Sequence, residues 1–126
     1  TGNAAQGEAL QERQQTPAQG QWDSPGRNIL RLQDLEINEI SETVMRDGHP
    51  VDLTDTEYEV LHLLAKNRRQ IFSAERLYEA VWQEPYYYGA NNTVMVHIRN
   101  LRRKIEKDPK NPKLIKTVWG RGYRCD

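Results

Sequence analysis

Residues 92–107, NTVMVHIRNLRRKIEK, combine the spacing of an amphipathic helix with a concentration of positive charge. Apolar residues recur every three or four positions, as they do along one stripe of a helix: Val94, Ile98, Leu101 and Ile105. The other face holds no carboxylate and consists of Val96, Arg99, Asn100, Arg103 and Lys107. We therefore predict a helix that packs one face on a core and offers the other face to an anionic partner.

A second basic segment, LIKTVWGRGYR at residues 114–124, follows closely. It consists of two short runs of β-forming residues around Gly120-Arg121-Gly122. Glycine on both sides of Arg121 permits a tight turn and a close approach to another backbone. A basic helix followed by a basic hairpin is what a winged-helix protein presents to DNA. The two segments together predict a DNA-binding unit.

The formal net charge of the chain is zero, but the charge is unevenly distributed. Residues 91–126 hold ten Lys and Arg against three Asp and Glu, a net charge of +7. Residues 1–90 hold eight against fifteen, a net charge of −7. The neutral total therefore hides a basic C-terminal third, so composition does not exclude a nucleic-acid partner.

Other classes of protein find little support in the sequence. The single cysteine, Cys125, allows no internal disulfide, and its position near the terminus indicates an incidental thiol. No segment has the ~18–20 apolar residues of a membrane span or the pattern of a signal peptide, so we expect a cytoplasmic protein. No nucleophile–base pair, metal-ligand spacing or phosphate-binding glycine loop is present, so we expect neither an enzyme nor a cofactor. The chain starts at Thr1 rather than at methionine, which suggests a piece of a longer protein.

The chain divides into a tail and one domain. Residues 1–26 are rich in Gln, Gly, Ala and Glu and hold two large apolar residues, so we predict a disordered linker or tail. Residues 27–126 form the predicted domain. It begins with three or four short antiparallel strands, and Asp47-Gly48 provides a strong hairpin-turn signal. The expected strands are Ile29–Leu32, Leu35–Ile37, Thr43–Arg46 and Val51–Leu53.

Three helices are expected after the strands. Thr54 and Glu57 have the spacing of a capping box, and this first helix ends near Asn67. Ser73 caps the second helix, and either Asn91 or Asn92 caps the third. The third helix ends at residues 108–112. The inward residues of the first helix are Tyr58, Leu61, Leu64 and Ala65, and those of the second are Leu77, Ala80 and Val81.

Three segments resemble, in order and spacing, the effector domain of OmpR/PhoB-type response regulators: LTDTEYEVLHLLAKNRRQIFSAERLYEAVW, NNTVMVHIRNLRRKIE and IKTVWGRGYR. The resemblance covers residues 29–124, and TVMVHIRNLRRK and KTVWGRGY are most similar to VanR-like members. It implies an α+β fold, a winged helix-turn-helix with an N-terminal four-stranded antiparallel sheet, three helices and a C-terminal hairpin wing. Gln83, Asn92, Met95, Asn100 and Cys125 depart from the common pattern of the family.

The resemblance also implies partners. Such domains follow a receiver domain that a sensor histidine kinase phosphorylates, so residues 1–26 would end the interdomain linker. They bind direct repeats in double-stranded DNA as head-to-tail dimers. They contact RNA polymerase through the loop before the recognition helix, which here holds Tyr86, Tyr87 and Tyr88. Packing of these tyrosines against the body of the domain is an equal alternative.

The basic helix is expected to read bases in the major groove through Val96, Arg99, Asn100 and Arg103, with Met95 at the groove edge. Expected phosphate contacts, which set the register of the complex, are Trp82, Thr93, His97 and Arg102. In the wing, Arg121 suits a narrow minor groove. Thr117 and Trp119 would lie along the adjacent backbone, and Lys116 would add positive charge there. The alternative for Trp119 is that it simply covers the base of the hairpin.

A rival hypothesis keeps the fold and changes the function, because a winged helix does not by itself imply DNA binding. On this view the acidic sheet and the tyrosine loop would hold polymerase or another regulator, and the domain would be a protein-interaction module.

Overall fold

The computed structural model describes residues 28–126, so the predicted linker at 1–26 lies outside the described residues. Contacts divide the chain into two units. The described part of one unit comprises 28–30 and 38–40, where the Glu39 amide donates to the carbonyl of Asn28 at 2.8 Å. The other unit, 31–37 and 41–126, holds both of the predicted functional segments.

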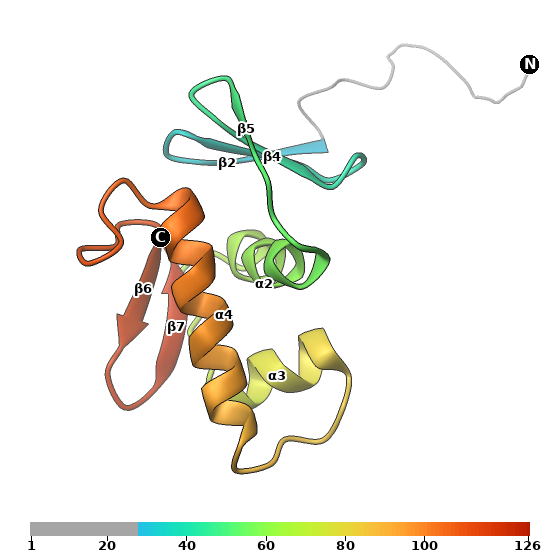
Figure 1. Cartoon of the computed structure of the whole chain (residues 1–126), viewed down its shortest axis with the longest axis vertical. Helices are drawn as coiled ribbons and strands as arrows, with labels where there is room; N and C mark the ends of the chain where they lie inside the picture. The colour runs from blue at the N-terminus through green and yellow to red at the C-terminus, as the bar shows by residue number, and fades with distance from the viewer. Residues whose placement is uncertain (1–27) are drawn as a thin grey trace, which may run out of the picture. The chain divides into compact units, whose positions relative to one another are not determined.

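Four short strands form one sheet in the order β2-β3-β4-β5 (Figure 1). Their bounds are Ile29–Leu32, Leu35–Asn38, Thr43–Arg46 and His49–Val51. Asp47 and Gly48 both have positive φ, 50° and 79°, as a two-residue hairpin turn requires. The prediction of a last strand at Val51–Leu53 is wrong by two residues. The tight turn places His49 directly opposite Arg46, so pairing begins at once.

Helix α2 (Asp55–Lys66) begins as the sequence predicts. The Glu57 amide donates to the Thr54 hydroxyl at 3.1 Å, and the Thr54 amide donates to the Glu57 carboxylate at 3.0 Å. This capping box satisfies amides that a helix N-terminus leaves without partners. The helix ends at the cap residue Asn67, and all four of its predicted inward residues are buried.

Helix α3 (Ala74–Trp82) begins at the predicted cap, where the Arg76 amide donates to the Ser73 hydroxyl at 3.1 Å. The prediction of its inward face is partly wrong. Leu77 is buried, but Ala80 is exposed and Val81 is half-buried. Tyr78 is buried instead, because its ring stacks on Trp82 with centroids 5.1 Å apart.

The cap residue that ends α3 departs from the family pattern. Gln83 has φ 58°, in the left-handed region, and its amide donates to the Glu79 carbonyl at 3.1 Å. Glycine adopts this conformation without steric cost, which explains why glycine suits this position.

Helix α4 (Ala90–Ile105) buries the predicted stripe of Val94, Ile98, Leu101 and Ile105. The predicted asparagine cap is wrong, because the cap residue is Gly89 and no side chain accepts a cap hydrogen bond. Carbonyls of the preceding loop replace it. The Ala90 amide donates to Tyr87 at 2.9 Å, so both asparagines lie inside the first turn. The helix also ends before Lys107, which instead pairs with Asp34 at 3.6 Å.

Strands β6 (Ile115–Val118) and β7 (Gly122–Cys125) form the C-terminal hairpin, which lies beside α4 in Figure 1. Phe72 and Tyr123 exchange backbone hydrogen bonds at 2.8 and 2.9 Å, which fixes β7 to the connection between α2 and α3. A side chain at Gly122 would collide with the Phe72 carbonyl, so this position requires glycine. The expected winged helix-turn-helix is confirmed. Among the described residues, none of the helices is long and apolar enough to cross a membrane.

Candidate nucleic-acid interface

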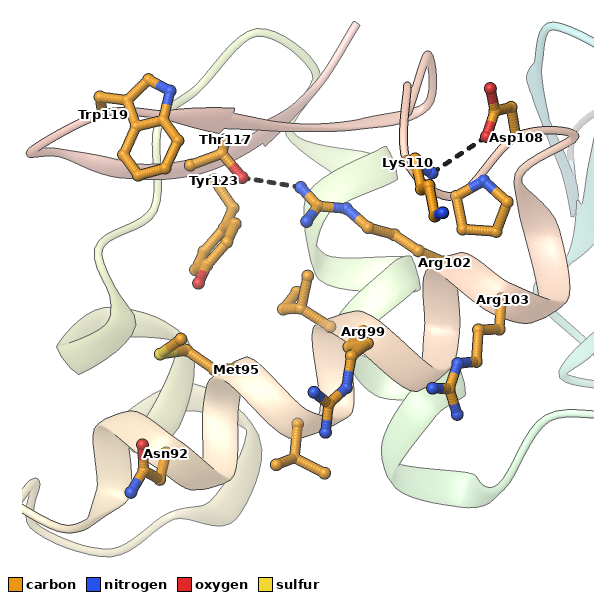
Figure 2. Close-up of a pocket in the computed structure, with 13 residues that line it drawn as sticks. Asn92, Met95, Arg99, Arg102, Arg103, Asp108, Lys110, Thr117, Trp119 and Tyr123 are labelled. Carbon is orange, nitrogen blue, oxygen red and sulfur yellow. Dashed lines mark hydrogen bonds between the residues drawn. The ribbon is translucent and has the colours of Figure 1, made fainter.

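A groove of about 1020 Å³ lies between α4 and the hairpin (Figure 2). The helix contributes residues that recur every three or four positions and so share one face: Asn92, Met95, Val96, Arg99, Arg102 and Arg103. The buried Ile98 also lines the groove. The hairpin contributes Thr117, Trp119 and Tyr123, and the loop after α4 contributes Asp108, Pro109 and Lys110. The groove therefore gathers seven of the residues predicted to contact DNA: Met95, Val96, Arg99, Arg102, Arg103, Thr117 and Trp119.

The groove is positively charged and partly apolar. Its cations are Arg99, Arg102, Arg103 and Lys110, and Asp108 is the one carboxylate among the described residues that line it. Asp108 accepts hydrogen bonds from the Asn111 side chain at 2.9 Å and the Lys110 amide at 3.1 Å, and these bonds lower its pKa. Apolar surface is also open to solvent, since Met95 is 50% exposed and Trp119 is 89% exposed. Such a surface suits a polyanion that also presents apolar edges.

Arg102 donates its hydrogen bonds to the hairpin. Its Nε and Nη2 donate to the Ile115 carbonyl at 3.1 and 2.9 Å, and Nη2 also donates to the Thr117 hydroxyl at 2.9 Å. Its guanidinium carbon lies 5.8 Å from the centre of the Tyr123 ring. Burial lowers the pKa of Arg102, yet an arginine stays charged in proteins. The sequence predicted a phosphate contact here, and the structure shows internal hydrogen bonds that join helix and hairpin.

Glu106, the residue that caps the end of α4, holds the same hairpin and was missed by the sequence reasoning. The residue is only 5% exposed. Its carboxylate accepts hydrogen bonds from the amides of Lys113 at 2.8 Å, Leu114 at 3.0 Å and Ile115 at 2.9 Å. Three amides around one carboxylate compensate for its burial. A helix-ending glutamate carries no sequence signal for this role, because its partners are backbone groups.

Three residues of the helix that were predicted to contact DNA lie outside the groove. Asn100, Thr93 and His97 stand on another side of α4, since each residue turns the helix by about 100°. His97 Nδ1 lies 2.8 Å from the Thr93 carbonyl. Its ring meets the Trp82 ring edge-on, with centroids 5.0 Å apart. Trp82 and His97 thus form a contact between α3 and α4.

The other predicted wing residues also lie outside the groove. Lys116 alternates with Thr117 along β6, so it faces away from α4. Its Nζ pairs with the Asp126 carboxylate at 2.7 Å. Arg121 is exposed in the hairpin turn, where its amide donates to the Val118 carbonyl at 2.9 Å. Arg121 therefore extends at the tip, beyond the groove that α4 lines.

Comparison with known proteins agrees with this architecture. A family model described as "Transcriptional regulatory protein, C terminal" matches residues 48–125. The chain is 53% identical over 90 residues to the uncharacterized transcriptional regulatory protein YrkP of Bacillus subtilis, covering 71% of this chain and 39% of YrkP. It matches the structure of Thermotoga maritima DrrB, an OmpR/PhoB homolog, with a TM-score of 0.71 and 34% identity, covering 78% and 44% of the two chains.

This chain belongs to the OmpR/PhoB-type family of C-terminal domains of transcriptional regulatory proteins. A further match is the Klebsiella pneumoniae RstA DNA-binding domain, solved in complex with the RstA box. Its TM-score is 0.70 at 29% identity, with coverage of 77% of this chain and 95% of that one. The chain spans less than half the length of YrkP and of DrrB.

The tyrosine loop of this OmpR/PhoB-type domain divides into packed and exposed residues. Tyr86 and Tyr87 meet the buried ring of Tyr78 edge-on, with centroids 6.1 and 5.9 Å apart. Tyr88 is 97% exposed. Tyr86 therefore packs on the body of the domain, whereas Tyr88 extends into solvent. The polymerase contact stays a prediction.

The domain also brings residues into the groove that the sequence reasoning did not select: Asn92, Asp108, Pro109, Lys110 and Tyr123. Asn92 shares the helix face of Met95 and Arg99, so its spacing was a usable signal. The loop residues lie there because Asp108 shapes a turn that directs the chain back along α4, which spacing does not reveal. Cys125 is buried, and burial beside the carboxylates of Glu106 and Asp126 raises the pKa of its thiol to about 12. Such a thiol is unreactive at neutral pH.

Proposed function

We propose that this domain binds double-stranded DNA in a sequence-specific manner and controls transcription as the effector of a two-component response regulator. The observation that carries the proposal is the groove beside α4, where exposed Arg99 and Arg103 alternate with exposed Met95 and Val96. Base edges in the major groove require this combination of forked donors and apolar contacts. The similarity to the RstA DNA-binding domain, which was solved in complex with the RstA box, supports the same function.

In the proposed complex, α4 lies in the major groove. Arg99 and Arg103 donate to guanine, while Met95 and Val96 contact thymine methyl groups. Phosphate contacts from Trp82, Thr93 and His97 set the position of the helix without specifying sequence. Lys110, which lines the protein groove beside α4, provides a further phosphate contact.

The hairpin extends from α4 toward the adjacent minor groove in the proposed complex. Arg121 enters that groove, whose negative potential attracts arginine. Trp119, which is 89% exposed, lies along the neighbouring backbone. Asn100 lies outside the protein groove beside α4. Its predicted base contact therefore requires α4 to rotate about its axis within the major groove of the DNA.

The proposal extends to the longer protein. Residues 27–126 would be the DNA-binding domain, and 1–26 would join it to a receiver domain that a sensor histidine kinase phosphorylates. The partial coverage of YrkP and DrrB supports a longer chain. We further propose a cytoplasmic protein that acts by binding rather than catalysis. It would occupy direct repeats as a head-to-tail dimer and offer Tyr88 to RNA polymerase.

The rival function, a protein-interaction module, is favoured by one observation, the exposure of Tyr88 and Tyr87 at 97% and 58%. Replacing Arg99, Arg103 and Arg121 together by alanine distinguishes the two. Loss of regulation of a reporter supports DNA binding, whereas regulation that survives the triple change supports the interaction module. Duplex binding is measured alongside, with Tyr88→Ala as the control: it leaves the groove intact and should bind DNA unchanged, whatever its effect on regulation.

Selecting from a random library the DNA duplexes that bind the 126-residue chain tests the proposal directly. The affinity of the selected duplex and of a random duplex is then titrated at two salt concentrations. We expect enrichment of a short direct repeat and a slope of log K against log salt of about −0.9 for each neutralised phosphate. Equal affinity for the selected and the random duplex would refute sequence-specific binding by this domain.

A further inference from the structure

Arg102 in the last turn of α4 and the cap residue Glu106 hold both backbone polar groups of one hairpin residue. The Ile115 carbonyl accepts from the Arg102 guanidinium, and the Ile115 amide donates to the Glu106 carboxylate. Ile115 is the first residue of β6 and is fully buried. The start of the wing is therefore fixed to the end of α4 by charged side chains on both sides of one residue.

The other backbone attachments of the hairpin lead elsewhere. Tyr123 in β7 exchanges hydrogen bonds with Phe72, and the Arg69 amide donates to the Cys125 carbonyl at 2.7 Å. Arg69 and Phe72 lie between α2 and α3 rather than on α4, so these bonds fix β7 to the body of the domain. Arg102 and Glu106 reach across from the end of α4 to β6, and they therefore act on the angle between the hairpin and α4.

Small errors in this angle become large at the wing tip. Four residues of strand separate Ile115 from Trp119, a length of about 13 Å. A tilt of roughly 10° at Ile115 would displace the tip by about 2 Å over that length. Such a displacement exceeds the tolerance of a hydrogen bond, whose length varies over only about 0.5 Å.

We infer that Arg102 and Glu106 are positioning residues for DNA binding, which fix the wing so that its tip reaches the minor groove while α4 occupies the major groove. The inference rests on the proposed function. It gives Arg102 a different role from the phosphate contact that its sequence position suggests. Arg102 acts through the geometry of its guanidinium, which bonds to Ile115 and Thr117 at the same time.

Substitution of Arg102 by lysine distinguishes the effect of side-chain geometry from the effect of charge. An Arg102→Lys variant keeps the positive charge but has a single nitrogen in place of the planar fork. If Arg102 contacts a phosphate, lysine restores most of the affinity and Arg102→Gln lowers the salt slope by about 0.9. If Arg102 positions the wing, Arg102→Lys and Arg102→Gln lose a similar amount of affinity for the duplex, because neither side chain reproduces the guanidinium geometry.

The experiment is a double-mutant cycle between Arg102 and Arg121, measured with the duplex selected from the random library. Arg121→Ala is expected to lower affinity on the order of tenfold, as the loss of a charged contact does. Arg102→Gln and Arg102→Lys are expected to lower it by a similar factor. The double variants should lose no more than the larger single loss, because a displaced tip has no contact left to lose.

A second cycle, between Arg99 and Arg121, is the matched control. Both residues are proposed DNA contacts, but Arg99 lies on α4 and does not hold the wing, so their losses should multiply. Urea unfolding of each variant shows whether it is folded. Hydroxyl-radical footprints should show that Arg102→Lys loses protection at the minor groove while retaining it along α4.

The outcomes are distinct. Multiplicative losses for Arg102 and Arg121, or rescue by lysine, would overturn the positioning role. If Arg102→Gln does not fold, the footprint of the milder Arg102→Lys decides. An intact wing footprint in that variant would also overturn the inference. If the unaltered chain and Arg99→Ala bind the selected and random duplexes alike, the proposed function itself fails.

Discussion

The four cations near the end of α4 are of two kinds. Arg102 bonds to the hairpin, and Lys104 Nζ pairs with Glu57 of α2 at 2.6 Å. Arg99 and Arg103 are exposed and line the groove. A single basic segment thus contains cations that hold the domain together beside cations that are exposed in the groove. The residue type is shared, and the surroundings determine the role.

The distinction predicts opposite results for substitution of the two sets. A residue engaged inside the protein contributes to folding, so its loss lowers the free energy of unfolding. An exposed residue in the groove contributes little to folding, so its loss changes only binding. Four changes, taken from the largest expected effect to the smallest, test this division.

Glu106→Ala should give the largest effect. It leaves the amides of Lys113, Leu114 and Ile115 without their acceptor, and each buried orphan costs about 1–3 kcal/mol. We expect the free energy of unfolding to fall by about 3 kcal/mol or more in urea titrations followed by circular dichroism. Glu59→Ala, an exposed glutamate on α2, should change it by less than about 0.5 kcal/mol. A similar small loss at Glu106 would contradict the structure.

Arg99→Ala should change binding and spare folding. We expect it to remove about 1–3 kcal/mol of discrimination between the selected duplex and single-base variants. Its unfolding free energy should stay within about 0.5 kcal/mol of the unaltered chain. Asn100→Ala, the next residue on the same helix, lies outside the groove and should cost less discrimination. Equal losses at the two positions would show that the groove does not define the reading face.

Glu57→Gln tests the engaged Lys104 with a smaller change. Glutamine still completes a capping box, so the change removes the ion pair with Lys104 and about 1 kcal/mol of stability. Burial alone would raise the pKa of Glu57, but hydrogen bonds from Lys104 and Thr54 outweigh burial and leave that pKa below 4.5.

The pH dependence of unfolding supplies the check on Glu57. Because folding lowers the pKa of Glu57 below 4.5, the pair stabilises the fold above pH 4.5 and this contribution is lost as the pH falls below that value. Urea titrations at a series of pH values should therefore give curves for the unaltered chain and Glu57→Gln that converge at acid pH. Parallel curves would mean that the pair does not stabilise the fold.

Lys116→Ala should give the smallest effect. Its ammonium pairs with Asp126 on the side of the hairpin away from α4, and the hydrogen bond from Lys116 lowers the pKa of Asp126. We expect binding to selected and random duplexes to weaken alike, by less than about threefold, in titrations at one salt concentration. A larger loss on the selected duplex alone would assign Lys116 a role in reading sequence.

Local patterns predicted the helices well because their causes are local. The capping box at Thr54 and the cap at Ser73 depend on residues three apart, and both are confirmed. The third helix shows the limit of this reasoning. Asn91 is a good cap by residue type, but the carbonyls of the tyrosine loop satisfy the helix amides and the helix begins earlier. The competing partner was not visible in the spacing.

The candidate site shows the same limit. Periodicity placed Arg99 on the face opposite the apolar stripe, the sequence predicted a phosphate contact for Arg102, and both residues do line one groove. It could not indicate that β6 returns beside Arg102 and takes up its donors. Tyr88 and Tyr86 likewise have the same sequence signal, and only the position of Tyr78 separates the exposed ring from the packed one.

The sequence by itself determined the order of the elements, the buried face of α4 and the basic character of the C-terminal third. These follow from side-chain periodicity and charge, which act over a few residues. The tertiary structure decided which cations are free to meet a partner. That choice depends on Ile115, Thr117 and Glu57, which the fold brings to α4 from other elements. Arg102 and Lys104 are bonded to groups of other elements, whereas Arg99 and Arg103 remain exposed in the groove.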